Sequence, residues 1–283
     1  MYNHLEPIDD GLATRCVGLW AKEKLDYLRR YIEVFEGAMR DKWRERNYVD
    51  LMAGPGKNRV RETGEIMLGS PLLALTTRYP FTGYHFVDMD PMNTVALKQR
   101  CASSHLAQSV DCITGDCNVV VDQIVSNLRA TENQSLNLAF LDPAGLELTW
   151  STVAKLASIR RMDIIINYPE GGLNRYMRQA NQAACNTVVD AFFGTREWRA
   201  IYDRRQTSQY RRVHRELLDL YRSKLADVGY VDIRQSEEPL MRNVVRRAPL
   251  YRLLFASKHE LGERFWREVT QRNVYGQRRL LEI

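Results

Sequence analysis

Short apolar runs alternate with helical patterns along most of the chain. The runs span residues 48–53, 84–90, 112–116, 136–142 and 162–168. Runs this apolar and this short, separated by helical segments, are typical of parallel strands covered on both faces. Two later runs, 231–236 and 249–257, predict an antiparallel pair that completes the sheet. The predicted fold class is therefore α/β, with a mostly parallel sheet and an antiparallel C-terminal strand pair.

Helical patterns flank and interrupt these runs. A first helix is predicted over 19–43, where apolar positions recur at spacings of three and four residues. These positions are Leu25, Leu28, Ile32 and Phe35. A long helical stretch, about 173–228, exceeds the single crossover helix that a parallel unit needs, so part of it is predicted to be an inserted cap or docking element. No repeat or linker divides the chain, and 1–283 is predicted to be a single domain.

Composition excludes several classes of protein. The 283 residues are 45% hydrophobic and 27% charged, which is typical of a globular protein. No apolar run approaches the roughly 18 residues of a membrane-spanning helix, and no signal peptide is evident, so a cytoplasmic protein without membrane contact is expected. The five cysteines form no CxxC pair and the histidines no HExxH, so no metal site is predicted. A net charge of +6 favours polyanions such as DNA or RNA.

The first strand leads into a glycine loop. In YVDLMAGPG, residues 48–56, Gly54 and Gly56 let the backbone turn tightly and approach a ligand. The third glycine of a dinucleotide fingerprint is absent, and Gly56-Lys57 lacks the following Ser or Thr of a phosphate-binding loop. NAD and ATP are therefore disfavoured.

Acidic residues close the next strands. Asp88 lies where an acid can accept both hydroxyls of a ribose. Asp116 lies where a carboxylate can read an adenine amino group. With Asp50 and the glycine loop, these acids occur in the order expected for a site that binds S-adenosylmethionine. In the simpler interpretation, Asp88 or Asp90 caps the following helix and Asp116 is a turn residue.

The fourth and fifth strands end in candidate catalytic residues. Asp142 closes the most apolar strand, where an uncompensated buried carboxylate is costly, and Asn167 ends the fifth strand. Both are predicted to face the methyl acceptor. Enzymes that methylate exocyclic amines often carry Asp/Asn-Pro-Pro-aromatic at this place, and the sequence Asp142-Pro143-Ala144-Gly145 departs from it. Amine methylation loses support for that reason, although a version split between Asp142 and Asn167 is left open.

Basic residues gather in two segments. Residues 57–69 carry Lys57, Arg59 and Arg61, and are predicted either to grip an anionic substrate over the cofactor or to form a solvated loop. The next helix is predicted to start with Ser70 as its N-cap. In the long helical stretch, arginines alternate with aromatic residues, which suits a phosphate backbone with exposed bases. The alternative is a solvated helix face with its aromatic side chains turned into the core. The candidate nucleic-acid-binding arginines are Arg175, Arg204, Arg205, Arg211 and Arg212.

The motifs together resemble those of a known family. YVDLMAGPG, GSPLLAL, FLDPAG, INYP with Arg175, FFGTREW and LYRLLFASKHELG are similar to motifs of the three-Cys-motif partner proteins, from about Trp20 to near the C-terminus. Lys24 matches a lysine in the family's first helix. The resemblance implies a Rossmann-like methyltransferase fold and, in bacterial and phage settings, a partner: a three-Cys-motif protein that looks like an iron–sulfur radical enzyme.

Two functions follow from these patterns. The first is an S-adenosylmethionine-dependent methyltransferase that acts on a nucleic acid or on a product of the three-Cys-motif protein. The second is a non-catalytic partner that keeps the fold in order to bind a nucleic acid or to dock the companion protein.

Overall fold

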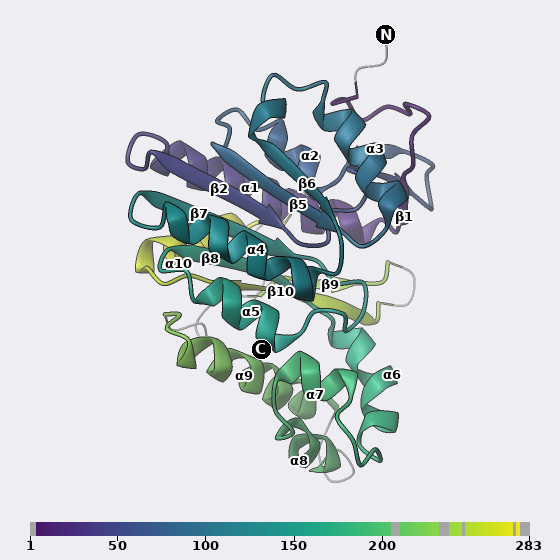
Figure 1. Ribbon diagram of the computed structural model, residues 1–283. Helices are drawn as coiled ribbons and strands as arrows, with labels where there is room; N and C mark the ends of the chain where they lie inside the picture. The colour runs from purple at the N-terminus through teal and green to yellow at the C-terminus, as the bar shows by residue number, and fades with distance from the viewer. Residues whose placement is uncertain (1–3, 205–209, 232–237, 245–246, 274–275, 278–283) are drawn as a thin grey trace.

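The computed structural model describes residues 4–204, 210–231, 238–244, 247–273 and 276–277. Its main feature is a seven-stranded sheet with the order β6-β5-β2-β7-β8-β10-β9 (Figure 1). The strands are β2 (Glu45–Asp50), β5 (Gly83–Asp88), β6 (Val110–Thr114), β7 (Ser135–Leu141), β8 (Met162–Tyr168), β9 (Leu240–Arg242) and β10 (Pro249–Ala256). Neighbouring strands run parallel except at β10, which is antiparallel to both β8 and β9. The predicted mostly parallel sheet with an antiparallel C-terminal pair is confirmed.

Among the described residues, the last strand of the sheet is β9. The prediction placed a strand at 231–236, most of which lies outside the described residues. The observed partner of β10 is β9, within the segment predicted to be a connection. Met241 explains this choice, because its side chain is fully buried in the same apolar cluster as Leu253 of β10.

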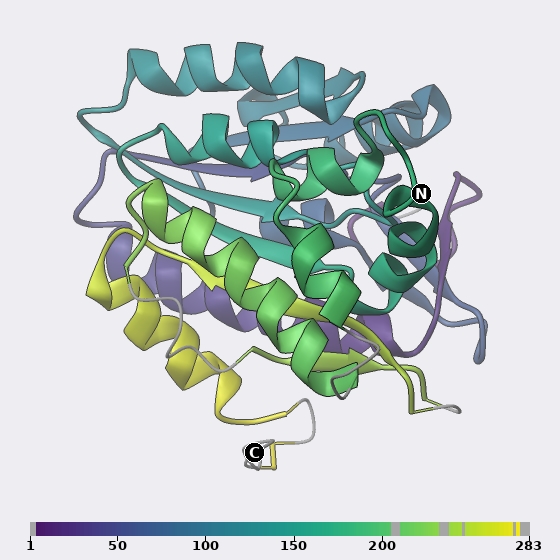
Figure 2. The ribbon, with the colours of Figure 1, turned by 90° about the horizontal axis from the view of Figure 1, so that it is seen from below.

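Both faces of the sheet are covered because successive strand residues alternate between two clusters. Val49 and Ile166 belong to the cluster that includes α4 and α5, whereas Tyr48 and Ile165 belong to the cluster that includes α1, α2, α3 and α10. The bounds are α1 (Trp20–Met39), α2 (Ser70–Leu75), α3 (Pro91–Cys101), α4 (Cys117–Ala130), α5 (Trp150–Ala157) and α10 (Glu260–Thr270), with a short 3₁₀ helix at Ala107–Ser109. Figure 2 shows α10 and α1 beneath the sheet.

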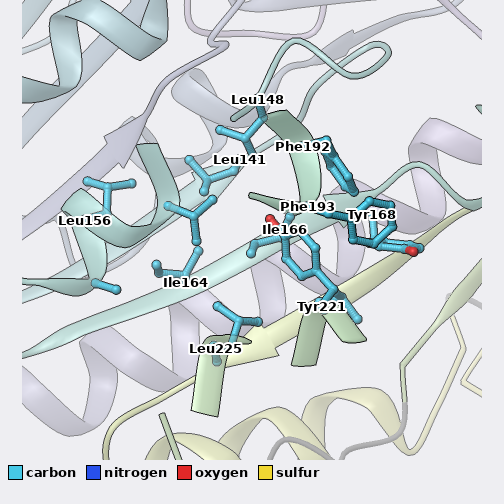
Figure 3. Packing of buried hydrophobic residues seen from close by; sticks show 14 of the residues in the cluster. Leu141, Leu148, Leu156, Ile164, Ile166, Tyr168, Phe192, Phe193, Tyr221 and Leu225 are labelled. Carbon is cyan, nitrogen blue, oxygen red and sulfur yellow. The ribbon is translucent and has the colours of Figure 1, made fainter. Parts of the chain in front are cut away.

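The long helical stretch breaks into separate helices rather than one. They are α6 (Glu170–Ala180), α7 (Val188–Phe193), α8 (Trp198–Asp203) and α9 (Tyr210–Asp227), grouped at the bottom of Figure 1. Phe192 of α7 and Tyr221 of α9 stack with ring centroids 5.1 Å apart, beside Tyr168 of β8 (Figure 3). These helices therefore share the core of the sheet, and their description as an insertion stays a prediction.

A small second sheet lies beside the glycine loop. It has the order β1-β3-β4, from β1 (Arg15–Val17), β3 (Lys57–Val60) and β4 (Ile66–Leu68). Residues 57–69 are therefore mainly a β-hairpin paired with the N-terminal strand, which corrects the prediction of a loop. The N-cap of α2 is Gly69 rather than Ser70, because the Ser70 hydroxyl bonds to the Asp50 carboxylate instead.

Candidate active site

A cavity of about 510 Å³ lies at the carboxyl ends of β2, β7 and β8. In open α/β sheets this edge is where ligands bind. The cavity wall includes Met52 and Ala53 of the glycine loop as well as Asp142 and Asn167. The N-terminal segment, α1, α6 and β10 supply much of the remaining wall, including Arg15, Trp20, Lys24, Gly171, Arg175 and Tyr251. The structure thus brings both predicted catalytic residues to the same cavity as Met52 and Ala53 of the glycine loop.

Asp142 is held by two side chains from distant parts of the chain. The Lys24 ammonium of α1 forms a buried ion pair with Asp142 Oδ2. Asn167 Nδ2 of β8 donates a hydrogen bond of 2.7 Å to Asp142 Oδ1. Lys24 Nζ also lies over the rings of Trp20 and Tyr251, at 5.4 Å and 5.5 Å from their centroids. The cost of burying the Asp142 carboxylate is therefore met by a cation and an amide donor.

The charges of this pair are coupled. Burial opposes ionisation of Asp142, but the Lys24 and Arg15 cations outweigh it and hold the pKa of the carboxyl below its usual value. Burial lowers the pKa of Lys24, and Asp142 offsets only part of that effect. Asp142 is therefore an ionised carboxylate at neutral pH, able only to accept hydrogen bonds.

Two buried polar atoms on the cavity wall remain unsatisfied. Asn167 is 4% exposed, and its Oδ1 has no hydrogen-bond partner among the described residues. The Tyr251 hydroxyl, also buried, likewise lacks a partner within the described part of the chain. Buried polar atoms in proteins are nearly always paired, so these two mark a place for a ligand or water.

The two glycines of the loop have different roles. Gly54 has φ +63°, and a Cβ there would meet only Arg15 Cδ, at 4.0 Å. The space over Gly54 is thus open except for the Arg15 stem. Gly56 has φ +91°, and its Cβ would lie 2.9 Å from a Leu97 methyl and 3.1 Å from Leu72 Cγ. Gly56 is therefore needed for packing against α2 and α3 rather than for contact with a ligand.

Asp88 ties the end of β5 to the glycine loop. Its Oδ2 accepts the Gly54 N–H at 2.8 Å, while its Oδ1 accepts from Asp90 N–H and Asn93 Nδ2, at 2.9 Å and 3.0 Å. Asp90 caps α3, because its Oδ1 accepts a hydrogen bond from the Met92 N–H. Asp88 is thus free of the capping role. Its Oδ1 already accepts two hydrogen bonds, and its Oδ2 keeps one lone pair for a ligand.

The other two predicted cofactor acids differ in exposure. Asp116 is exposed and caps α4 by accepting the Asn118 N–H at 2.8 Å, a role that the sequence interpretation gave to Asp88 or Asp90 and not to Asp116. Asp50 is fully buried at the end of β2. Burial raises its pKa to about 7, and the Ser70 hydroxyl offsets only part of that rise. Neither Asp116 nor Asp50 is part of the cavity wall.

The basic residues of the hairpin are engaged within the protein. Lys57 is 0% exposed, and its Nζ pairs with Asp10 at 2.8 Å and with the Ile8 carbonyl at 3.0 Å. Lys57 therefore anchors the N-terminal segment and cannot reach an anionic substrate. Arg59 pairs with exposed Asp9, and Arg61 is exposed.

The aromatic side chains that the structure describes in the arginine-rich helices offer no stacking surface. Trp198 and Tyr202 are buried, and the Trp198 indole N–H donates to Asp190 at 2.9 Å. The aromatic rings have therefore turned into the core, as the alternative interpretation predicted. Arg204 and Arg212 both pair with Glu216. Arg205 lies outside the described residues, as does the side chain of Arg211. Arg175 alone among these arginines lines the cavity.

Sequence patterns missed the partners that tertiary structure supplies. The Lys24–Asp142 pair joins residues 118 positions apart, and Arg15 comes from a strand of only three residues. The match of Lys24 to the three-Cys-motif partner family was the one signal that pointed to it.

No group of three or more His, Cys, Asp or Glu side chains among the described residues could hold a metal ion. Over the same residues, no helix has the length and apolar character that a bilayer crossing requires.

Comparisons with known proteins give structural likeness only. No family model and no curated protein matches the chain, so its membership of the three-Cys-motif partner family stays a prediction. Cofactor-bound Rv0187 from MTB is 10% identical, with a TM-score of 0.42 over 88% of this chain and 84% of that chain. A SAM-dependent O-methyltransferase from Thermotoga maritima is 10% identical, with a TM-score of 0.36 over 80% and 64% of the two chains. A human methyltransferase 10 domain containing protein is 13% identical, with a TM-score of 0.37 over 56% and 70%.

Likeness at these TM-scores carries no argument about function, and the strand order and direction define the fold. The chain is an α/β protein with a Rossmann-like sheet of the methyltransferase type, closed by the antiparallel strand β10.

Proposed function

We propose that this protein is an S-adenosylmethionine-dependent methyltransferase whose acceptor is a nucleic acid or a product of a three-Cys-motif protein. One observation carries the proposal: a single cavity joins Met52 and Ala53 of the glycine loop to the paired residues Asp142 and Asn167. A cofactor on the loop and an acceptor at the pair would therefore share one enclosed space.

The residues around the loop fit the nucleoside part of the cofactor. Gly54 leaves the loop backbone uncovered, and Asp88 Oδ2 keeps a lone pair for a ribose hydroxyl. Met89 directly follows Asp88 and is 72% exposed, an unusual position for a large apolar side chain. A thioether side chain makes favourable contacts with aromatic rings, so Met89 suits the face of an adenine. The exposed Asp116 carboxylate lies at the end of the neighbouring strand β6.

Methyl transfer requires little of the protein beyond the alignment of the methyl donor with the acceptor. S-adenosylmethionine supplies a methyl group on a positively charged sulfur, and the acceptor lone pair forms the new bond while the carbon–sulfur electron pair stays on sulfur. Holding two reactants in line replaces a bimolecular encounter and can supply several kcal/mol of the barrier. Asp142 and Asn167 would orient the acceptor, and Lys24 would keep Asp142 ionised.

Calorimetry with S-adenosylmethionine and S-adenosylhomocysteine tests the proposal. We expect micromolar binding of both compounds. Asp88→Ala should weaken it about tenfold to a hundredfold, because hydrogen bonds to a charged group each contribute about 1.5–3 kcal/mol. Asp90→Ala is the matched control: it removes a helix cap two residues away, so it should lower the melting temperature slightly and leave affinity unchanged.

The failure of the wild-type protein to bind either compound would contradict the methyltransferase proposal and favour a non-catalytic docking role. Equal affinity in wild type and Asp88→Ala would remove Asp88 from the ribose site.

A further inference from the structure

The unsatisfied acceptor of Asn167 indicates which group the cavity receives. Because the ionised Asp142 carboxylate can only accept, the Asn167 amide must point its Nδ2 toward Asp142, and this fixes Oδ1 on the other side. Asn167 belongs to the cavity wall, and its Oδ1 is buried and has no hydrogen-bond partner among the described residues. An unpaired buried acceptor costs about 1–3 kcal/mol, which a ligand N–H would recover.

Two acceptors from neighbouring strands favour a particular donor. The Asp142 oxygens each accept one hydrogen bond and keep a further lone pair, so Asp142 and Asn167 together offer acceptors to the same ligand group. An amino group has two N–H donors and can satisfy both residues. A carbonyl oxygen at the same place would face two acceptors and gain nothing.

The charge of the cavity wall points to an anion elsewhere on the ligand. The charged side chains in the wall are Arg15, Lys24, Asp142 and Arg175. Lys24 neutralises Asp142, and neither Arg15 nor Arg175 forms an ion pair within the described part of the chain. Arg15 acts on Asp142 only by its charge at longer range, so neither guanidinium group is held in an ion pair among the described residues. The N-terminal turn of α6, which carries Gly171 and Gly172, lies in the same wall and adds a partial positive charge.

Flat apolar surfaces also line the cavity. Trp20 and Tyr251 meet edge to face with centroids 5.1 Å apart, and Pro143 and Pro169 also line the cavity. A heterocyclic ring gains dispersion contact with such surfaces, whereas an aliphatic amino acid would leave them largely unused. The volume of about 510 Å³ lies within the range of small-molecule sites.

We infer that the cavity binds a nucleotide unit whose base carries an exocyclic amino group, with the amino group on Asp142 and Asn167 and the phosphate on Arg15 and Arg175. This inference rests on the proposed function for the identity of the methyl acceptor, which becomes the amino nitrogen. That nitrogen forms the bond to the methyl carbon, the carbon–sulfur electron pair stays on sulfur, and the proton that the amino group loses goes to the ionised Asp142 carboxylate that accepts its hydrogen bond. The expected nucleotide binding does not depend on the proposed function.

Binding of matched nucleotides tests the inference without turnover. The full chain, saturated with S-adenosylhomocysteine, is titrated by calorimetry with CMP against UMP, AMP against IMP, and CMP against cytidine. The first two pairs exchange an amino group for a carbonyl, and the third removes the phosphate. We expect each amino nucleotide to bind about tenfold or more tightly than its carbonyl counterpart, and CMP about tenfold or more tightly than cytidine.

Two variants separate the contributions of base and phosphate. Asn167→Leu should abolish the preference for CMP over UMP and keep the preference for CMP over cytidine. Arg175→Gln should do the reverse. Arg178→Gln is the control, since Arg178 is exposed on the same helix but is absent from the cavity wall, and it should change neither preference.

Equal binding of CMP and UMP together with equal binding of AMP and IMP would overturn the inference. So would the absence of nucleotide binding while S-adenosylhomocysteine still binds, and the proposed function would then stand. If S-adenosylhomocysteine also fails to bind, both proposals fail.

Discussion

Asp10 holds the N-terminal segment onto the glycine loop, and its replacement gives a quantitative test of this structure. The buried carboxylate accepts from Arg100 Nε and Nη2 at 2.9 Å and 2.6 Å, and it pairs with Lys57 at 2.8 Å. Arg100 also donates to the Pro55 carbonyl in the loop. Asp10→Asn would leave two buried cations without a countercharge while keeping the shape of the side chain.

The expected cost is large. Removing one partner of a buried ion pair destabilises a protein by about 3–5 kcal/mol. A chain of 283 residues unfolds with an entropy of about 0.6 kcal/mol per kelvin, so the melting temperature should fall by about 5–8 °C. Burial opposes ionisation of Asp10, but Arg100 and Lys57 outweigh it and hold the pKa well below its usual value. The stabilisation is therefore present above the unfolded pKa of about 4 and is lost as the pH falls further.

Calorimetric melting of Asp10→Asn beside Asp9→Asn measures the effect. Asp9 is the adjacent acid, and its pair with Arg59 is exposed at the surface. An exposed pair contributes about 0–1 kcal/mol, so Asp9→Asn should melt close to wild type. If both variants melt at the same temperature at pH 7, the buried network does not stabilise the segment and the reasoning is refuted.

Two further predictions concern the edges of the cavity. Burial raises the pKa of Asp50 to about 7, so its contribution to stability is present below the unfolded pKa of about 4 and is lost as the pH rises through 7. The free energy of unfolding of Asp50→Asn relative to that of wild type should therefore rise by about 2–3 kcal/mol from pH 5 to pH 8, as measured by urea unfolding. A difference that shrinks as the pH rises would contradict the assignment. A Cβ on Gly171 would lie 2.4 Å from the Pro249 carbonyl, whereas one on Gly172 would meet its nearest atom at 3.6 Å. Gly171→Ala should lower the melting temperature by the equivalent of about 1–3 kcal/mol and Gly172→Ala should not, so equal melting temperatures would rule out the close approach of α6 to β10.

The sequence by itself determined the fold class. Strand residues covered on both faces must be apolar in nearly continuous runs, and that requirement is local, so 136–142 and 162–168 identify β7 and β8 almost to the residue. It also placed Asp142 and Asn167 at the ends of those strands. Because the carboxyl ends of parallel strands meet at one edge, two residues 25 positions apart were expected to face the same site.

Tertiary structure alone decided which charges are used within the protein. Lys57 and Arg175 are both basic residues that follow a strand. Lys57 forms a buried ion pair with Asp10, whereas Arg175 lines the cavity. The same holds for the alternation of arginine and aromatic residues near Trp198, whose rings turn inward. The sequence around a charged or aromatic residue does not identify the side chain that it will contact, because that partner can lie anywhere in the chain. The free energy of burial is fixed only when the fold brings the two together.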